Sequence, residues 1–278
     1  MSSQPNSAKL DLLVPFETEN IPAEYREYYE IKRHNLFASI DYFREMWNLY
    51  MALDHIFMRE FADLKTAREL DRTFPLLLYF NAHAKIRVAM ELAFTGCLAE
   101  ARSILRDAIE FAAHAHTMLT DVELQKKWLS KNDGKAALEA FKDAFERHKK
   151  NGIFKGLPEL ERVWGELSET GSHATINAMC DRFVQVDSAE HVEFNVNYCG
   201  VEERLWALSL FSMLMTCVTI EQTLFGDYES RLKFDDGLSQ LKGEFDRKKE
   251  QSREAIKIKY KVEPPSPIEI PKPIIFRP

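Results

Sequence analysis

Two segments of the chain carry polar side chains within otherwise apolar, helix-like sequence. The first contains Arg102, Arg106, Asp107, Glu110, His114 and His116, and the second contains Glu166, Ser168, Glu169 and His173. In the first segment Arg106, Glu110 and His114 recur at intervals of four, so a helix would place them in one row on one face. In the second segment Glu169 and His173 repeat the spacing of Glu110 and His114. The sequence therefore predicts two polar rows able to do chemistry if they face each other.

A glutamate and a histidine four residues apart on a helix can together chelate a divalent metal ion. Two such pairs on facing helices would resemble the inward-pointing ligands of carboxylate-bridged helical bundles. The candidate metal ligands are Glu110, His114, Glu169 and His173. The di-iron signature of those bundles spaces glutamate and histidine by three, and this spacing is missing here. We therefore expect no cofactor, and a bound divalent metal ion is the alternative.

The same residues can instead be read as a structural network. In this interpretation Arg106 pairs with Glu110 and Ser168 pairs with His173, and the bonds fix the register of two helices. The catalytic interpretation uses Arg106, Glu110, His114, Ser168 and His173 as its candidate residues. The chain contains no G-x-S-x-G, H-E-x-x-H, G-x-G-x-x-G or glycine-rich phosphate-loop motif. The sequence favours the structural network.

A strongly apolar segment, residues 203–225, is the element around which these rows must be arranged. Between Leu205 and Ile220 it carries no charged residue. A helix that is apolar on nearly every side has to be wrapped by other helices. A membrane span needs about 20 apolar residues, and this run is shorter. We therefore predict an all-α, multi-helix bundle built around a central apolar helix at 203–225.

The other helices are predicted from apolar periodicity and from proline and glycine positions. Expected helical segments are 23–70 as one helix or two, 73–95, 98–119, 135–152, a helix from 158 onward that continues past or breaks at 170–171, and 228–259. Gly96 marks a short turn between two antiparallel helices. One small β-hairpin is predicted at about 182–198, because apolar and polar residues alternate at 191–198.

The predicted domain organisation has three parts. Residues 1–21 form an N-terminal arm, residues 22–260 a single helical domain, and residues 261–278 a Pro-rich extended tail. Proline excludes a helix in this C-terminal arm and favours an extended or polyproline form. The tail is either disordered or docked on a groove or a neighbouring subunit, since it also holds Ile268, Ile270 and Phe276.

Composition narrows the range of partners and compartments. The net charge of −7 disfavours a general nucleic-acid binder, since neutralising phosphates requires a surplus of Lys and Arg. The four cysteines form no CxxC pair, which indicates reduced thiols. The N-terminus lacks the apolar run of a signal peptide. We therefore expect a cytoplasmic protein that does not bind membranes.

The segments LAEARSILRDAIEF and ELERVWGELSETGSHAT, followed by the hairpin-like stretch and the apolar helix, provide a family resemblance. Over about residues 75–225 the chain resembles a group of bacterial all-helical domains of unknown function that are distantly HEPN-like. The resemblance implies a helical homodimer that cuts RNA with an arginine and a histidine separated by four to six residues. In this chain seven residues separate Arg106 from His114.

Taken together, these patterns favour a cytoplasmic helical binding or regulatory module that forms a homo-oligomer, with a protein as its possible partner. The alternative is a metal-dependent or HEPN-like nuclease that uses Arg106, Glu110, His114 and His173.

Overall fold

The computed structural model describes residues 20–64, 70–145, 152–172, 183–187, 192–196, 202–229, 234 and 236–264. Its helices are α1 (Ala23–Tyr42), α2 (Arg44–Leu64), α3 (Leu70–Phe94), α4 (Leu98–Thr120), α5 (Val122–Leu129), α6 (Lys135–Phe145), α7 (Pro158–Leu167), α9 (Glu203–Glu229) and α10 (Asp236–Tyr260). A short π-helix, η2 (Ser168–Ser172), follows α7, and the strands are β1 (Phe183–Asp187) and β2 (Val192–Val196). The fold is all-α, as predicted.

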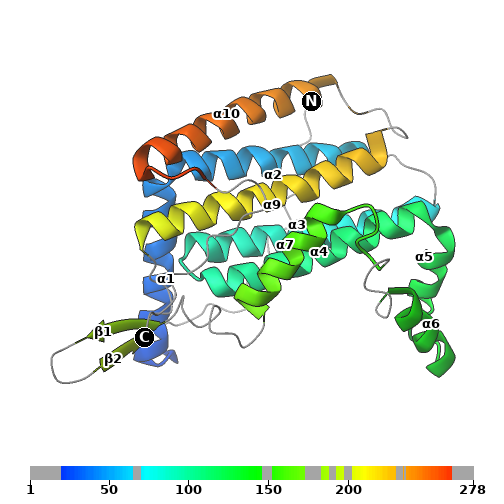
Figure 1. Cartoon of the computed structure of the whole chain (residues 1–278), viewed down its shortest axis with the longest axis horizontal. Helices are drawn as coiled ribbons and strands as arrows, with labels where there is room; N and C mark the ends of the chain where they lie inside the picture. The colour runs from blue at the N-terminus through cyan, green and yellow to red at the C-terminus, as the bar shows by residue number, and fades with distance from the viewer. Residues whose placement is uncertain are drawn as a thin grey trace.

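The long helices lie side by side around α9. Figure 1 shows α2, α9 and α10 running along one side of the molecule, with α3, α4 and α7 along the other. Helix α9 contacts α2, α3, α4, α7 and α10. Helix α1 crosses one end of this bundle, and α5 and α6 lie at the opposite end.

Helix α9 is the predicted core helix, and it extends beyond 225 to Glu229. Every side chain from Ala207 to Val218 is buried. Of the described helices, α9 has the length and composition to cross a membrane, but 78% of its most apolar stretch is buried inside the protein. The hydroxyl of Thr216 donates to the Ser212 carbonyl at 3.2 Å, so this polar group is satisfied within the helix.

The segment predicted as one or two helices at 23–70 forms two. The chain leaves α1 at Phe43, whose φ of −102° and ψ of 39° are not helical, and α2 begins at the next residue. Phe43 is itself buried, and its ring packs edge-on against Trp206 of α9 with 5.5 Å between centroids. Burial of this aromatic side chain fixes the point at which α1 turns across the bundle.

Helices α3 and α4 form the predicted antiparallel hairpin. Gly96 has a φ of 85°, which a residue with a Cβ adopts rarely, and the Cys97 amide donates to the Leu92 carbonyl at 2.9 Å to close the turn. The facing sides of the two helices are rich in buried alanine, including Ala82, Ala89, Ala93, Ala101, Ala108 and Ala112. These small side chains let the two helices pack closely along their length.

Helices α5, α7 and α10 differ from the prediction in detail, and α3 begins at Leu70 rather than at 73. Helix α5 was not predicted; Asp121 caps it by accepting the Glu123 amide at 2.9 Å. The helix starting at Pro158 neither continues as an α-helix nor breaks at 170–171, but widens into η2. Within η2, Thr170 donates its hydroxyl to the Glu166 carbonyl. The last helix begins at Asp236 rather than at 228.

Strands β1 and β2 pair antiparallel, with Phe183 opposite Val196 and Asp187 opposite Val192. The N-terminal arm up to residue 19 and the proline-rich segment 265–278 lie outside the described residues.

Candidate functional site

The first predicted polar row forms a compact cluster between α4, α7 and η2, which we call the Arg106 cluster (Arg106, Glu110, Trp164 and Ser168). Arg106 donates through Nε to Ser168 Oγ at 2.7 Å, and its Nη2 lies 2.9 Å from Glu110 Oε1. Trp164 donates its indole N–H to Glu110 at 2.8 Å, and the Arg106 guanidinium lies 4.6 Å from the Trp164 ring. The predicted Arg106–Glu110 pair is confirmed, and each polar group in the cluster is bonded to another.

Helix geometry accounts for this cluster. Arg106 and Glu110 are one turn apart on α4, and Trp164 and Ser168 are four residues apart across the end of α7. Ser168 also donates to the Trp164 carbonyl at 2.8 Å, which orients its oxygen toward Arg106. Arg102, one turn before Arg106, is almost completely buried and donates to Ser209 of α9 at 3.2 Å. The arginine row of α4 therefore ties that helix to α7 on one side and to α9 on the other.

If the Arg106 cluster is structural, then Glu110→Gln should lower the free energy of unfolding by about 1 to 3 kcal/mol. The substitution removes the negative charge of Glu110, so Oε1 loses its ion pair with Arg106 and accepts only weaker hydrogen bonds from Arg106 and Trp164. The matched control is Glu123→Gln, which removes an exposed ion pair with Lys126 and should change stability by less than about 1 kcal/mol. Chemical denaturation measures both. Equal stability of Glu110→Gln and wild type would contradict a structural role.

His114 does not join the Arg106 cluster. Its ring lies 5.3 Å from Phe145 and 6.5 Å from Trp128, measured between centroids, and its Nδ1 is buried without a hydrogen-bond partner. Burial, assisted by the positive charge of Lys131, lowers the pKa of His114 to about 4. His114 is therefore neutral at pH 7 and sits in an aromatic pocket, apart from the row that the sequence predicted.

The described part of the structure does not bring the predicted metal ligands together. Glu110 is engaged by Arg106 and Trp164, Glu169 is exposed on η2, and His173 lies outside the described residues. Within the described ranges no three His, Cys, Asp or Glu side chains are close enough to hold a metal ion. The metal-site alternative consequently stays a prediction.

Three polar clusters were not predicted, and each ties different helices together. Asp227 of α9 accepts from the hydroxyl of Tyr79 on α3 and is hydrogen-bonded to His116 Nδ1 on α4 at 2.7 Å. Burial, and then the Asp227 charge, raises the pKa of Tyr79 well above its ordinary value. The sequence signal that could have indicated this cluster is His116, a polar residue in an apolar stretch of α4.

The second unpredicted cluster joins α2 and α3. Arg87 makes a two-pronged pair with Asp54, with both N–O distances at 2.7 Å, and His83 Nε2 is also 2.7 Å from Asp54. Burial opposes ionisation of Asp54, but the hydrogen bonds from Arg87 and His83 outweigh it and hold the pKa of Asp54 well below its usual range. Asp54 of α2 therefore stays ionised at neutral pH, and its ion pair and hydrogen bonds link α2 to α3.

A third cluster, which we call the buried triad, consists of Glu60 of α2, Glu221 of α9 and Lys242 of α10. Lys242 Nζ lies 2.9 Å from Glu60 and is hydrogen-bonded to Glu221. The side chain of Glu60 is completely buried. A charged residue between Phe57 and Phe61 in an apolar stripe is the signal that could have identified it from the sequence.

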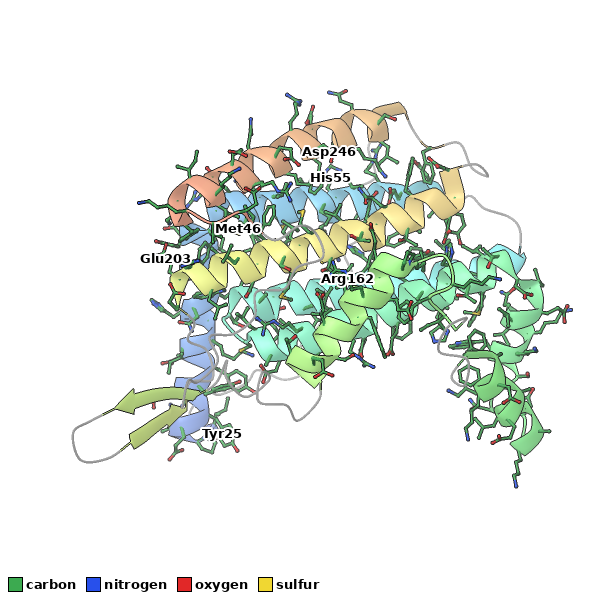
Figure 2. The ribbon with its side chains drawn as sticks, viewed as in Figure 1. Tyr25, Met46, His55, Arg162, Glu203 and Asp246 are labelled. Carbon is green, nitrogen blue, oxygen red and sulfur yellow. The ribbon has the colours of Figure 1, made fainter. Side chains whose placement is uncertain are left out.

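A groove of about 750 Å³ runs between α2 and α10. One wall consists of Glu45, Asn48, Met51, Ala52 and His55 of α2, and the other of Leu241, Glu244, Lys248, Gln251 and Ala255 of α10. Figure 2 labels His55 on α2 and Asp246 on the neighbouring α10. Three buried residues, Leu49, Phe245 and Ser252, also line it. An adjoining cavity of about 450 Å³ shares Glu45, Asn48, Ser252 and Ala255, so the groove continues toward the end of α10.

Comparison with known proteins adds no assignment: no protein-family model, curated protein or solved structure matches this chain.

Proposed function

We propose that this chain is a helical binding module that holds an amphipathic helix of a partner protein in the groove between α2 and α10. The observation that carries the proposal is the spacing of the two walls. On α2 and on α10 alike, the lining residues recur at intervals of three and four, which is the spacing by which one helix packs against another. A third helix laid along the groove would meet a matching row on each side.

The lining of the groove suits a helix rather than a small polar molecule. Ala52, Ser252 and Ala255 are small, so another backbone can approach closely, while Leu49 and Phe245 provide an apolar floor. The groove lining carries charges of both signs, Glu45 and Glu244 on one hand and Lys248 on the other. An amphipathic helix buries its apolar face in such a groove and pairs its flanking charges with the rim.

The Arg106 cluster supports a binding role indirectly. Arg106, Glu110 and Ser168 bond to one another, and His114 points into an aromatic pocket, so these candidates form no acid–base pair within the described residues. The nuclease alternative, the homo-oligomer and the cytoplasmic location stay predictions.

A display library of amphipathic helices of about 18 residues, panned against the full chain, tests the proposal. We expect helices that bind with micromolar affinity and lose at least about tenfold in affinity, or about 1.4 kcal/mol, on Ala255→Glu. That substitution places a charge on an exposed position of the groove wall. The matched control is Ala84→Glu, at an exposed position of α3 outside the groove, which should leave affinity unchanged. Enrichment of no helix, or equal binding to both variants, would refute the groove as the site.

A further inference from the structure

The buried triad joins three helices through one cation. Lys242 Nζ is within ion-pair distance of carboxylates from two different helices, Glu60 and Glu221, and it also lies 3.4 Å from the centre of the Phe225 ring. The side chains of Glu60 and Glu221 are 0% and 6% exposed. Two buried carboxylates facing a single ammonium leave one negative charge uncompensated if both are ionised.

Protonation of Glu60 removes this excess charge. As an ion, Glu60 has only Lys242 Nζ, 2.9 Å from its Oε1, to offset its charge, and it shares that ammonium with Glu221; as an acid it can donate its own proton to Glu221. Burial, followed by the neighbouring charge of Glu221, raises the pKa of Glu60 to about 9. With Glu60 protonated, one carboxylate faces the one ammonium of the triad, and the excess negative charge is gone.

We propose that the proton shared between Glu60 and Glu221 holds α10 against the bundle, and that losing it loosens α10 from α2 and α9. Lys242 is the residue through which α10 enters the triad, whereas the ion pair that Lys259 of α10 makes with Glu203 of α9 is about half exposed. Surface pairs of this kind contribute little to stability. The triad is buried, whereas the contacts of Lys259 and Tyr260 with Tyr42 and Glu203 are exposed, so we expect the triad to hold α10 and its wall of the groove more strongly than they do.

The groups whose charges act on Glu60 come from each neighbouring helix. Helix α9 contributes Glu221 and α10 contributes Lys242. On the side of α3, His83 stacks on Phe57 at 4.7 Å between ring centroids and is bound to Asp54. A substitution at Glu60 therefore separates the contribution of Glu60 from that of the neighbouring polar groups.

The direction of the pH effect follows from linkage. Unfolded, Glu60 has the ordinary pKa of 4.5; folded, it keeps its proton to a pH of about 9. Its contribution to stability is thus complete below pH 4.5 and is lost progressively as the pH rises toward 9. Helix α10 should be held firmly at mildly acidic pH and loosely at alkaline pH.

Hydrogen exchange of the full chain without ligand, corrected for intrinsic exchange rates, tests this. In the wild type, protection of α10 amides should fall at least about tenfold between about pH 6.5 and pH 9, while protection in α4 changes much less. In Glu60→Gln, which mimics the protonated acid, α10 should keep its protection at both pH values. Glu250→Gln, at an exposed position of α10, should behave like the wild type.

The proposal would be overturned if the protection of α10 amides in the wild type did not change with pH. It would also be overturned if Glu60→Gln lost as much protection between the two pH values as the wild type does. Lys242→Met provides a second variant if Glu60→Gln does not fold. It removes the cation of the triad, so α10 should already be weakly protected at about pH 6.5; protection equal to the wild type would also overturn the proposal. None of these readouts depends on what the groove binds.

Discussion

Leu210→Asp is expected to abolish the native fold. Leu210 is 1% exposed and lies in the buried stretch Ala207–Val218 of α9, a helix that contacts five others, so the new carboxylate would be buried without a partner. Such burial costs several kcal/mol, against a total stability of about 5 to 15 kcal/mol for a typical domain. Met213→Asp, at a residue 2% exposed, should have the same effect. Both variants should be insoluble or lack a cooperative thermal transition in circular dichroism.

The control for this prediction is Leu77→Asp, which makes the same chemical change at an exposed position of α3. Its unfolding free energy should lie within about 1 kcal/mol of wild type, since surface substitutions have small effects. Soluble Leu210→Asp and Met213→Asp proteins with native melting curves would show that α9 is not the core.

The second large effect is expected from Asp227→Ala. This substitution leaves the buried Tyr79 hydroxyl and His116 Nδ1 without their common acceptor, and three helices lose their shared tie. We expect a loss of about 2 to 4 kcal/mol, because each unsatisfied buried group costs about 1 to 3 kcal/mol and part of this cost is relieved by water. Urea unfolding of full-length protein measures it.

Asp246→Ala serves as the control for Asp227. Asp246 pairs with Lys249 on the surface of α10, and its side chain is 60% exposed, so its removal should change stability by less than about 1 kcal/mol. Equal effects at the two aspartates would mean that the Tyr79–Asp227–His116 cluster contributes no more than a surface pair.

Much of the fold could be predicted because its signals are local. The apolar run from Leu205 to Ile220 marks the core helix, Gly96 marks the turn of the α3–α4 hairpin, and Pro158 marks the start of α7. Each signal acts through neighbouring residues only. Helix α5 was missed because it has only eight residues, half of them polar, and its apolar side chains find partners only after folding.

The candidate site was only partly predictable. Arg106 and Glu110 are four residues apart, so helix geometry alone brings them together, and their pairing was foreseen. Asp227 and His116 are 111 positions apart, and only the packing of α4 on α9 decides that they meet. The groove depends in the same way on how α10 lies along α2, which no local pattern encodes.

Two native methionines on α2 test the groove most directly. Met51 lines the groove and is 43% exposed, whereas Met58 is 45% exposed and does not line it. In a methyl NMR titration of the full chain with a helix selected from the library, we expect the Met51 methyl signal to shift and the Met58 methyl signal to stay unchanged. Shifts at Met58 but not at Met51, or at neither, would contradict binding in the groove.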